Sequence, residues 1–341
     1  MSELMTHLDN LRATHLPQIL NLLETVVAEE SPADSSLAIM CAYHMETGGK
    51  RLRALLPLAV GEALGVDAAR LVAFGAACEM LHNATLVHDD LQDGDRVRRD
   101  KPTIWVEFGE ARAINLGDAM FYWPLLILMR LDCDVQRREK LSKRLLRETL
   151  RVIDGQDREF LLKDLSAPTM TDYFKMVEGK TSGLFALPMA GAAEFCAAPG
   201  EVVAALERAA GHLGVLFQIQ DDVLDLYADK GREHRGTDIC EGKISALVVH
   251  FLTHAPPEQR ARLRDILAAD RDATTLTQID WAAKAFRLEG SLQFALDEIA
   301  RRRDLACNAP EFAEYPQLKS LLNAMADIFL EPIAPLLNAP A

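Results

Sequence analysis

The sequence predicts an all-α protein, a single large helical bundle around a central cavity, in which residues 1–341 form one domain. Apolar side chains recur at three- and four-residue intervals over long stretches, which is the spacing of one face of a helix. Strict alternation of apolar and polar residues, the pattern of a strand, is nearly absent. Glycine and proline stand in short breaks rather than in a long linker. These observations favour one continuous helical domain over two.

The first half of the chain divides into helices at short glycine or proline breaks. An apolar stretch over residues 16–26 predicts a helix that ends before Ser31-Pro32. A second break follows at Gly48-Gly49. The apolar stretch that begins at residue 71 continues to a group of aspartates and ends at Gly94-Asp95. We therefore expect a long, buried helix with an acidic end.

The second half repeats this arrangement. Pro199-Gly200 precedes another long apolar segment, which also ends in aspartates before a break over residues 228–236. The next break is Ala255-Pro256-Pro257, and apolar spacing over residues 292–299 predicts a further helix near the C-terminus. The Arg301-Arg302-Arg303 run is expected to be a solvated helix face.

Composition excludes some partners. Of 341 residues, 49% are hydrophobic, which is enough to bury a sizeable core. The formal net charge of −14 argues against nucleic acid as a partner, because binding a phosphate backbone needs a basic face.

The cysteines and the apolar runs indicate a cytoplasmic protein. The six cysteines form no C-x-x-C pair and no zinc-like spacing, so reduced thiols are expected. No basic segment followed by an apolar one opens the chain, and the longest apolar run, Phe121 to Met129, is too short for a transmembrane segment.

The pattern D-D-x-x-D occurs twice, and each copy ends one of the two long apolar segments. The aspartates are Asp89, Asp90 and Asp93 in the first copy and Asp221, Asp222 and Asp225 in the second. On a helix the first and last aspartates of each copy lie one turn apart on the same face. Magnesium favours carboxylate oxygen and usually completes its coordination with substrate phosphate. Two such clusters predict metal ions that hold a phosphorylated substrate between them.

A single acidic run at a helix end is often solvated surface. Here the residues before each copy are apolar and core-like, among them Leu86 and Val87 in one case and Leu216 and Phe217 in the other. Because the pattern also recurs, the metal interpretation is favoured over the surface one.

Clustered cations complete the predicted site. Lys50, Arg51 and Arg53 follow Gly48-Gly49, where the backbone can approach an anion closely. A helix stop followed by solvated side chains would give the same string. Arg98-Arg99 follows the first aspartates and suits fork-like phosphate binding. Weaker candidates are Lys180-Thr181 and Gly242-Lys243.

In their order and spacing these motifs resemble the trans-isoprenyl diphosphate synthases, the polyprenyl synthetase family, and within it the geranylgeranyl and polyprenyl diphosphate synthases. The resemblance runs from about residue 45 to about residue 250. It is carried by the glycine-lysine-arginine string, His82 through Asp93, Arg98-Arg99 with Lys101-Pro102-Thr103, Gly155-Gln156, Lys180-Thr181, Phe217 through Asp225, and Gly242-Lys243.

The resemblance implies a transferase that joins isopentenyl diphosphate head-to-tail to an allylic diphosphate. It implies that the six aspartates bind Mg²⁺, three ions in all, which grip the allylic diphosphate. Its residue roles carry over by position. Arg98, Lys180 and Lys243 would contact the allylic diphosphate; Lys50, Arg53, His82 and Arg99 would bind isopentenyl diphosphate; Lys180, Thr181 and Gln218 would be catalytic, the last two by stabilising the allylic cation. It also implies a homodimer.

Small side chains before the first aspartates bear on product length. Ala84 and Thr85 lie one turn deeper on the helix, which leaves room beyond fifteen carbons. We expect a product of about twenty carbons, with twenty-five or more as the alternative.

The chain departs from the family pattern in three places. Asp100 stands where glycine is usual, the loop from Gly231 to Gly236 carries Arg232 where lysine is common, and Ile244-Ser245-Ala246 follows Gly242-Lys243. None of these removes an aspartate.

Two other classes are open alternatives. A class I terpene cyclase would share the helical pocket and one aspartate motif, but it has no use for a second cationic pocket. A non-catalytic synthase subunit typically lacks aspartates that this chain keeps.

Overall fold

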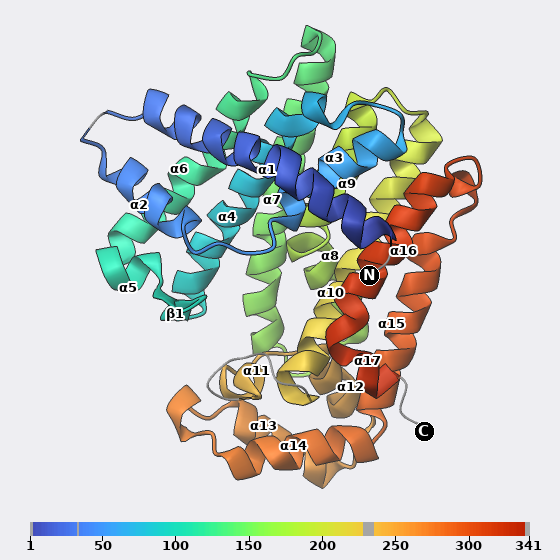
Figure 1. The fold of residues 1–341 in the computed structure, drawn as a ribbon. Helices are drawn as coiled ribbons and strands as arrows, with labels where there is room; N and C mark the ends of the chain where they lie inside the picture. The colour runs from blue at the N-terminus through green and yellow to red at the C-terminus, as the bar shows by residue number, and fades with distance from the viewer. Residues whose placement is uncertain (1–2, 33, 228–234, 338–341) are drawn as a thin grey trace. The chain divides into compact units, whose positions relative to one another are not determined.

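The computed structural model describes residues 3–32, 34–227 and 235–337 and confirms the all-α prediction. Helices make up nearly all of the regular structure within these ranges, and one short hairpin interrupts them (Figure 1). The chain groups into two compact units. The single domain expected over residues 1–341 stays a prediction.

Unit 1 comprises residues 1–149, 184–207 and 311–321. Its complete elements are α1 (Glu3–Glu29), α2 (Ser36–Met45), α3 (Leu52–Ala63), η1 (Ala68–Leu71), α4 (Val72–Gln92), β1 (Val97–Arg98), β2 (Lys101–Pro102), α5 (Ile104–Phe108) and α6 (Glu110–Leu128). The first part of α7 (Val135–Asp164), most of α9 (Gly183–Phe195), the start of α10 (Gly200–Tyr227), the end of η3 (Pro310–Phe312) and the first part of α16 (Pro316–Leu330) also belong to it.

Unit 2 comprises residues 150–183, 208–310 and 322–341. It contains the rest of α7, α10 and α16, together with α8 (Met170–Lys180), α11 (Thr237–Cys240), α12 (Ala246–His254), α13 (Pro257–Leu267), η2 (Arg271–Ala273), α14 (Leu276–Leu288), α15 (Ser291–Cys307), η4 (Glu331–Ile333) and α17 (Ala334–Leu337).

Helix α4 is the central helix of unit 1. It is buried on most sides and contacts α1, α3 and α6, which explains why its sequence is apolar almost all round. Two glycines bring its neighbours close. A Cβ on Gly75 would lie 2.3 Å from the backbone oxygen of Ala54 in α3, and one on Gly117 of α6 would lie 2.1 Å from the His88 ring. This packing holds the acidic end of α4 in place.

The hairpin that follows α4 pairs Val97 with Pro102 and Arg98 with Lys101 in antiparallel register. Its two turn residues, Arg99 and Asp100, both have positive φ, at 52° and 66°. Two-residue hairpin turns of this kind favour glycine, asparagine or aspartate. Aspartate at position 100, where glycine is usual in the family, is therefore compatible with the turn.

In unit 2 the end of α8 is enclosed by small residues. A Cβ on Gly155 of α7 would lie 2.0 Å from the backbone nitrogen of Lys180, and one on Gly214 of α10 would lie 2.3 Å from the hydroxyl oxygen of Ser182. The Ser182 hydroxyl donates to the carbonyl oxygen of Gly211 at 3.1 Å. Helices α7 and α10 thus fix the segment that carries Lys180 and Thr181.

The solvated face expected for residues 301–303 is wrong for its central residue. Arg302 is only 6% exposed. Its Nε donates to Glu298 at 2.7 Å, and its guanidinium lies 4.5 Å from the centroid of the Phe174 ring. The sequence of the arginine run is typical of a solvated face. Arg302 is buried nevertheless, because it pairs with Glu298 one turn earlier on the same helix and packs against Phe174 of α8.

Two helical segments meet the length and composition of a membrane span, Gly200–Tyr227 and Pro316–Leu337. Core helices meet the same criteria, and α10 carries three aspartates near its end. The expected absence of a transmembrane segment stays a prediction.

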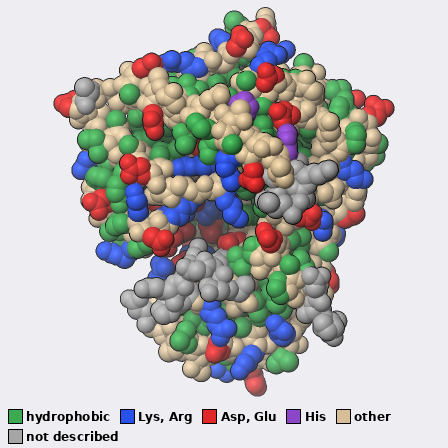
Figure 2. Space-filling model, in the orientation of Figure 1, with side chains coloured by type: hydrophobic (Ala, Val, Ile, Leu, Met, Phe, Trp, Pro, Cys, Tyr) green, Lys and Arg blue, Asp and Glu red, His purple; other side chains and the backbone are tan. Residues whose placement is uncertain are grey.

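On the face drawn in Figure 2, acidic, basic and hydrophobic side chains are interspersed.

The close approach of α7 and α8 predicts the effect of a methyl group at Gly155. Gly155→Ala should lower the free energy of unfolding by about 1–3 kcal/mol, because the new Cβ meets backbone that cannot rotate away. Gly211→Ala is the matched control, since a Cβ there meets nothing within 4 Å; it should leave stability unchanged or raise it by about 0.5–1 kcal/mol. Urea unfolding measures both. Equal stabilities would contradict the packing described.

Candidate active site

The first aspartate motif lies at the C-terminal end of α4. Asp89 and Asp93 are half-buried, one turn apart, and Asp93 is the C-cap. The last turn of α4 contains no basic residue. Because a helix C-terminus carries partial negative charge, carboxylates there are unfavourable without a cation nearby. The position of the motif thus favours cation binding.

The middle aspartate, Asp90, has a different environment. It is 1% exposed, its Oδ1 accepts a hydrogen bond from Nε of Arg98 at 2.6 Å, and the same oxygen forms an ion pair with Nη2 at 2.5 Å. Its Oδ2 is buried and has no hydrogen-bond partner among the described residues. Burial raises the pKa of Asp90 against the opposing effect of Arg98. This carboxylate anchors the hairpin to α4.

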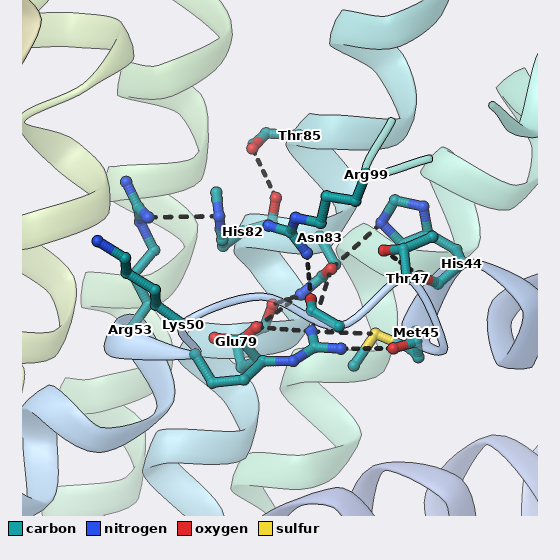
Figure 3. A network of polar contacts seen from close by, with 12 residues as sticks. His44, Met45, Thr47, Lys50, Arg53, Glu79, His82, Asn83, Thr85 and Arg99 are labelled. Carbon is teal, nitrogen blue, oxygen red and sulfur yellow. Dashed lines mark hydrogen bonds and ion pairs between the residues drawn. The ribbon is translucent and has the colours of Figure 1, made fainter. Parts of the chain in front are cut away.

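The glycine loop lies against the other arginine of the hairpin. Gly48 and Gly49 have φ of 77° and 117°, and Arg99 donates from Nη1 to the carbonyl oxygen of Gly48. A Cβ on Gly49 would lie 2.5 Å from the Arg99 guanidinium and would displace it, and the positive φ of Gly49 itself favours glycine. Figure 3 shows Arg99 above this loop and Lys50 beside it.

Arg53 and His82 form a second group of polar side chains in unit 1, which we call the cationic pocket together with Lys50 and Arg99. Nη1 of Arg53 lies 3.3 Å from Nε2 of His82, and its guanidinium lies 5.0 Å from the Phe185 ring centroid. Burial and the neighbouring arginines hold the pKa of His82 well below its usual value, so its ring is neutral. With Nε2 accepting from Arg53, the proton is assigned to Nδ1. That Nδ1, like Nε of Arg53, is buried and lacks a partner within the described chain, which suits an anionic ligand.

Beneath this pocket is a polar network that sequence reasoning missed. Arg51 has φ of 51°, and its side chain turns inward to Glu79, with Nη1 2.9 Å from Oε1. Asn83 donates to the same oxygen at 3.0 Å and faces Nε2 of His44 at 3.2 Å (Figure 3). Of the three cations after the double glycine, Arg51 therefore holds the loop. Glu79 and Asn83, two polar residues four positions apart in an otherwise apolar helix, are the sequence signal that could have predicted this network.

In unit 2 the predicted catalytic residues adjoin one another. Nζ of Lys180 lies 2.5 Å from Oε2 of Glu159 on α7, and Thr181 follows as the C-cap of α8. The Thr181 hydroxyl donates to Oε1 of Gln218 at 3.2 Å.

The second aspartate motif lies near the C-terminal end of α10. Asp221 is half-buried, whereas Asp222 and Asp225 are buried. Asp225 accepts from the Thr237 hydroxyl at 2.6 Å and from the backbone N–H of Asp238 at 3.1 Å. Burial raises the pKa of Asp222 to about 6, although the backbone N–H of Ala246 and two side chains donate to it.

Lys243 lies in the sequence between Asp238 and Ala246, whose backbone N–H groups donate to Asp225 and Asp222. Its Nζ is 3.0 Å from Glu241 and 3.8 Å from Asp238, and Gly242 before it has φ of 64°. Most of the unusual Gly231–Gly236 loop, including Arg232, lies outside the described residues.

The predicted residues divide between the two units. Lys50, Arg53, His82, Asp89, Asp90, Asp93, Arg98 and Arg99 belong to unit 1, and Lys180, Thr181, Gln218, Asp221, Asp222, Asp225 and Lys243 to unit 2. The meeting of the two aspartate motifs across one cavity stays a prediction.

Within the described ranges, no three or more His, Cys, Asp or Glu side chains are grouped so that they could hold a metal by themselves. A pair such as Asp89 and Asp93 nevertheless fits Mg²⁺, which binds through one or two carboxylates, water and substrate phosphate. The donor set therefore fits an ion that arrives with its substrate.

Sequence comparison identifies relatives along nearly the whole chain. The family model described as polyprenyl synthetase matches residues 34–285. The geranylgeranyl diphosphate synthase of Methanosarcina mazei is 30% identical over 338 residues, 96% of this chain and 98% of that protein. The short chain isoprenyl diphosphate synthase of Methanocaldococcus jannaschii is 35% identical over 69% of this chain and 72% of its own length.

Solved structures agree. A geranylgeranyl pyrophosphate synthetase from Pyrococcus horikoshii superposes with a TM-score of 0.83 at 27% identity, covering 95% of this chain and 98% of that one. A decaprenyl diphosphate synthase from Rhodobacter capsulatus has a TM-score of 0.82 over 95% and 98% of the two chains. At 24% identity, the latter shows a shared fold alone.

Burial of His44 predicts a pH-dependent stability. Burial and nearby arginines lower its pKa from 6.5 to about 3. Below pH 6.5 the unfolded chain binds a proton that the folded chain does not, so stability falls by up to about 1.4 kcal/mol per pH unit. His44→Gln removes this penalty and can still donate to Asn83. Its deficit in unfolding free energy relative to the parent should therefore shrink between pH 7 and pH 5. Urea unfolding across this range is the measurement, and a constant difference would contradict the prediction.

Proposed function

Because the chain belongs to the polyprenyl synthetase family and is a prenyltransferase, we propose that it condenses isopentenyl diphosphate with an allylic diphosphate to give a product of about twenty carbons. One observation carries the proposal. The consecutive arginines of the hairpin reach two different places: Arg98 pairs with Asp90, the middle residue of the first aspartate motif, and Arg99 contacts the Gly48 loop. These two separate contacts support two anion sites in unit 1, as two diphosphate substrates require.

The six aspartates are proposed to bind the Mg²⁺ ions, three in number, that accompany the allylic diphosphate. When bound, these ions neutralise negative charge on the leaving diphosphate. Arg98, Lys180 and Lys243 contact the same diphosphate. Isopentenyl diphosphate occupies the other site, where Lys50, Arg53 and Arg99 supply positive charge and the neutral His82 supplies its Nδ1 proton.

The reaction begins when the bond between the first allylic carbon and oxygen breaks and diphosphate leaves with the electron pair. The Thr181 and Gln218 oxygens stabilise the resulting cation with their dipoles. The double bond of isopentenyl diphosphate then attacks this carbon and forms the new carbon–carbon bond. The departed diphosphate takes the proton that is lost, so no side-chain base is required.

The small residues before Asp89 support the proposed product length. Ala84 is fully buried and Thr85 nearly so. Deeper in unit 1, the bulky residues Met80, Leu81 and Met120 are fully buried as well. Relatives named as geranylgeranyl diphosphate synthases support twenty carbons. A longer product, of twenty-five carbons or more, is the alternative.

The second anion site argues against a class I terpene cyclase, which needs one diphosphate site. The retention of all six aspartates argues against a non-catalytic subunit. Both alternatives predict no elongated diphosphate product.

We also propose a cytoplasmic homodimer. Along α6 the side chains of Ile114, Tyr122, Leu126 and Met129 are exposed and share one face, with Tyr122 69% exposed. Such a face is suited to a self-complementary two-fold contact. All six cysteines are free thiols, which fits a reducing compartment.

The reaction is tested by incubating the protein with Mg²⁺, isopentenyl diphosphate and, separately, dimethylallyl, geranyl and farnesyl diphosphates. Chromatography of the products should show elongation that stops at about twenty carbons. Asp89→Ala should lower kcat by at least about 100-fold, because the leaving charge loses metal support. Asp132→Ala, which removes an exposed carboxylate of unit 1, should leave the rate unchanged. Cyclic hydrocarbon as product, or no turnover of any starter, would reject the proposed reaction.

A larger side chain at Ala84 should shorten the product. Ala84→Phe adds a ring one turn below Asp89, so elongation should stop near fifteen carbons. The control is Ala73→Phe, which adds the same bulk near the other end of α4 and should leave product length unchanged. Unchanged products from both variants would show that Ala84 does not line the chain-binding pocket.

A further inference from the structure

A continuous chain of hydrogen bonds in unit 2 joins a buried tyrosine to the predicted cation-stabilising residues. The Tyr173 hydroxyl donates to Oδ2 of Asp222 at 2.8 Å. Oδ1 of Asp222 accepts from Nε2 of Gln218 at 3.1 Å, one turn earlier on α10. Oε1 of Gln218 accepts from the Thr181 hydroxyl at 3.2 Å. The chain thus connects the middle of α8 with its end by way of α10.

The carboxylate of Asp222 determines which way the Gln218 amide faces. An ionised carboxylate only accepts hydrogen bonds, so the amide must turn its NH₂ group toward Asp222. Its carbonyl oxygen then points to Thr181. Because the Thr181 proton is used in that bond, the lone pairs of its oxygen are left to face a positive charge. Every bond in the chain therefore has a defined direction.

The Tyr173 hydroxyl stabilises the orientation of the Asp222 carboxylate. It is 1% exposed, and its hydroxyl shares Oδ2 of Asp222 with the backbone N–H of Ala246, which donates at 2.8 Å. With Gln218 on Oδ1, three donors surround one buried carboxylate. A buried carboxylate is stable only with such donors. Without the tyrosine hydroxyl, Oδ2 of Asp222 keeps only the Ala246 N–H as a donor, so the carboxylate can rotate and release the Gln218 amide.

We propose that Tyr173 is a positioning residue for the prenyl transfer reaction, acting through Asp222 to orient the oxygens of Gln218 and Thr181 toward the developing cation. The inference rests on the proposed function, because it assigns Gln218 and Thr181 to the reaction centre. It also gives Asp222 a positioning role in addition to the metal binding proposed for the six aspartates. Both Asp222 oxygens are engaged by protein donors.

The test is Tyr173→Phe, with Tyr227→Phe as the matched control. Tyr227 belongs to the same unit, and its hydroxyl donates to the carbonyl oxygen of Ala283 at 2.7 Å, so the control also loses one tyrosine hydrogen bond. We expect Tyr173→Phe to lower kcat by about 10- to 100-fold, the loss of a hydrogen bond to a charged group, with KM for both substrates within about twofold of the parent. The control should keep its kcat.

A double-mutant cycle separates positioning from general destabilisation. If Tyr173 acts through Gln218, then Tyr173→Phe should lower kcat no more than about twofold further in a Gln218→Ala background. If the two residues acted independently, the fold-losses in kcat of the two single variants would multiply in the double variant.

Three outcomes are decisive. A kcat of Tyr173→Phe equal to that of Tyr227→Phe, or multiplicative effects with Gln218→Ala, would overturn the positioning role. Failure of the parent protein to elongate any allylic diphosphate would reject the proposed function instead. If Tyr173→Phe fails to fold, Tyr173→Met, which also lacks the hydroxyl donor, replaces it in the same cycle with Gln218→Ala, and multiplicative effects there would again overturn the inference.

Discussion

A carboxylate that is taken out of water costs several kcal/mol unless hydrogen-bond donors surround it, and each unit of this protein is arranged around such a group. In unit 1, Asp90 binds Arg98 and so fixes the hairpin against α4. In unit 2, Asp222 gathers a tyrosine, an amide and a backbone N–H from three different helices. The middle aspartate of each motif thus connects neighbouring elements, while three of the four outer aspartates, Asp89, Asp93 and Asp221, are half-buried.

Close packing also fixes the segment that carries the proposed catalytic residues. Glycines at positions 155 and 214 let α7 and α10 approach the end of α8, where any Cβ would clash. Lys180 and Thr181 therefore lie on a segment held from two sides. The same principle applies to Gly49, where the absence of a side chain makes room for Arg99. These glycines allow neighbouring segments to pack closely, and their role here does not depend on backbone flexibility.

Charge in the cationic pocket is balanced by two means. Glu79 neutralises Arg51 below the glycine loop. His82 remains neutral because burial and its arginine neighbours lower its pKa, so it adds a hydrogen-bond donor without adding repulsion. The donors that we propose for a diphosphate can in this way lie close together in the folded protein without net repulsion.

The sequence by itself determined the helical class, the acidic ends of the two long helices and the family, because each depends on local spacing of residue types. The sequence also identified the aspartates and the clustered lysines and arginines of the predicted site. Only the tertiary structure decided what those groups do for one another. Arg51 turns inward while Arg53 joins the pocket, Arg302 is buried although its neighbours are not, and Asp222 accepts from Tyr173, forty-nine positions earlier. Such pairings depend on which helices pack together, and the spacing within one helix carries no information about its partner.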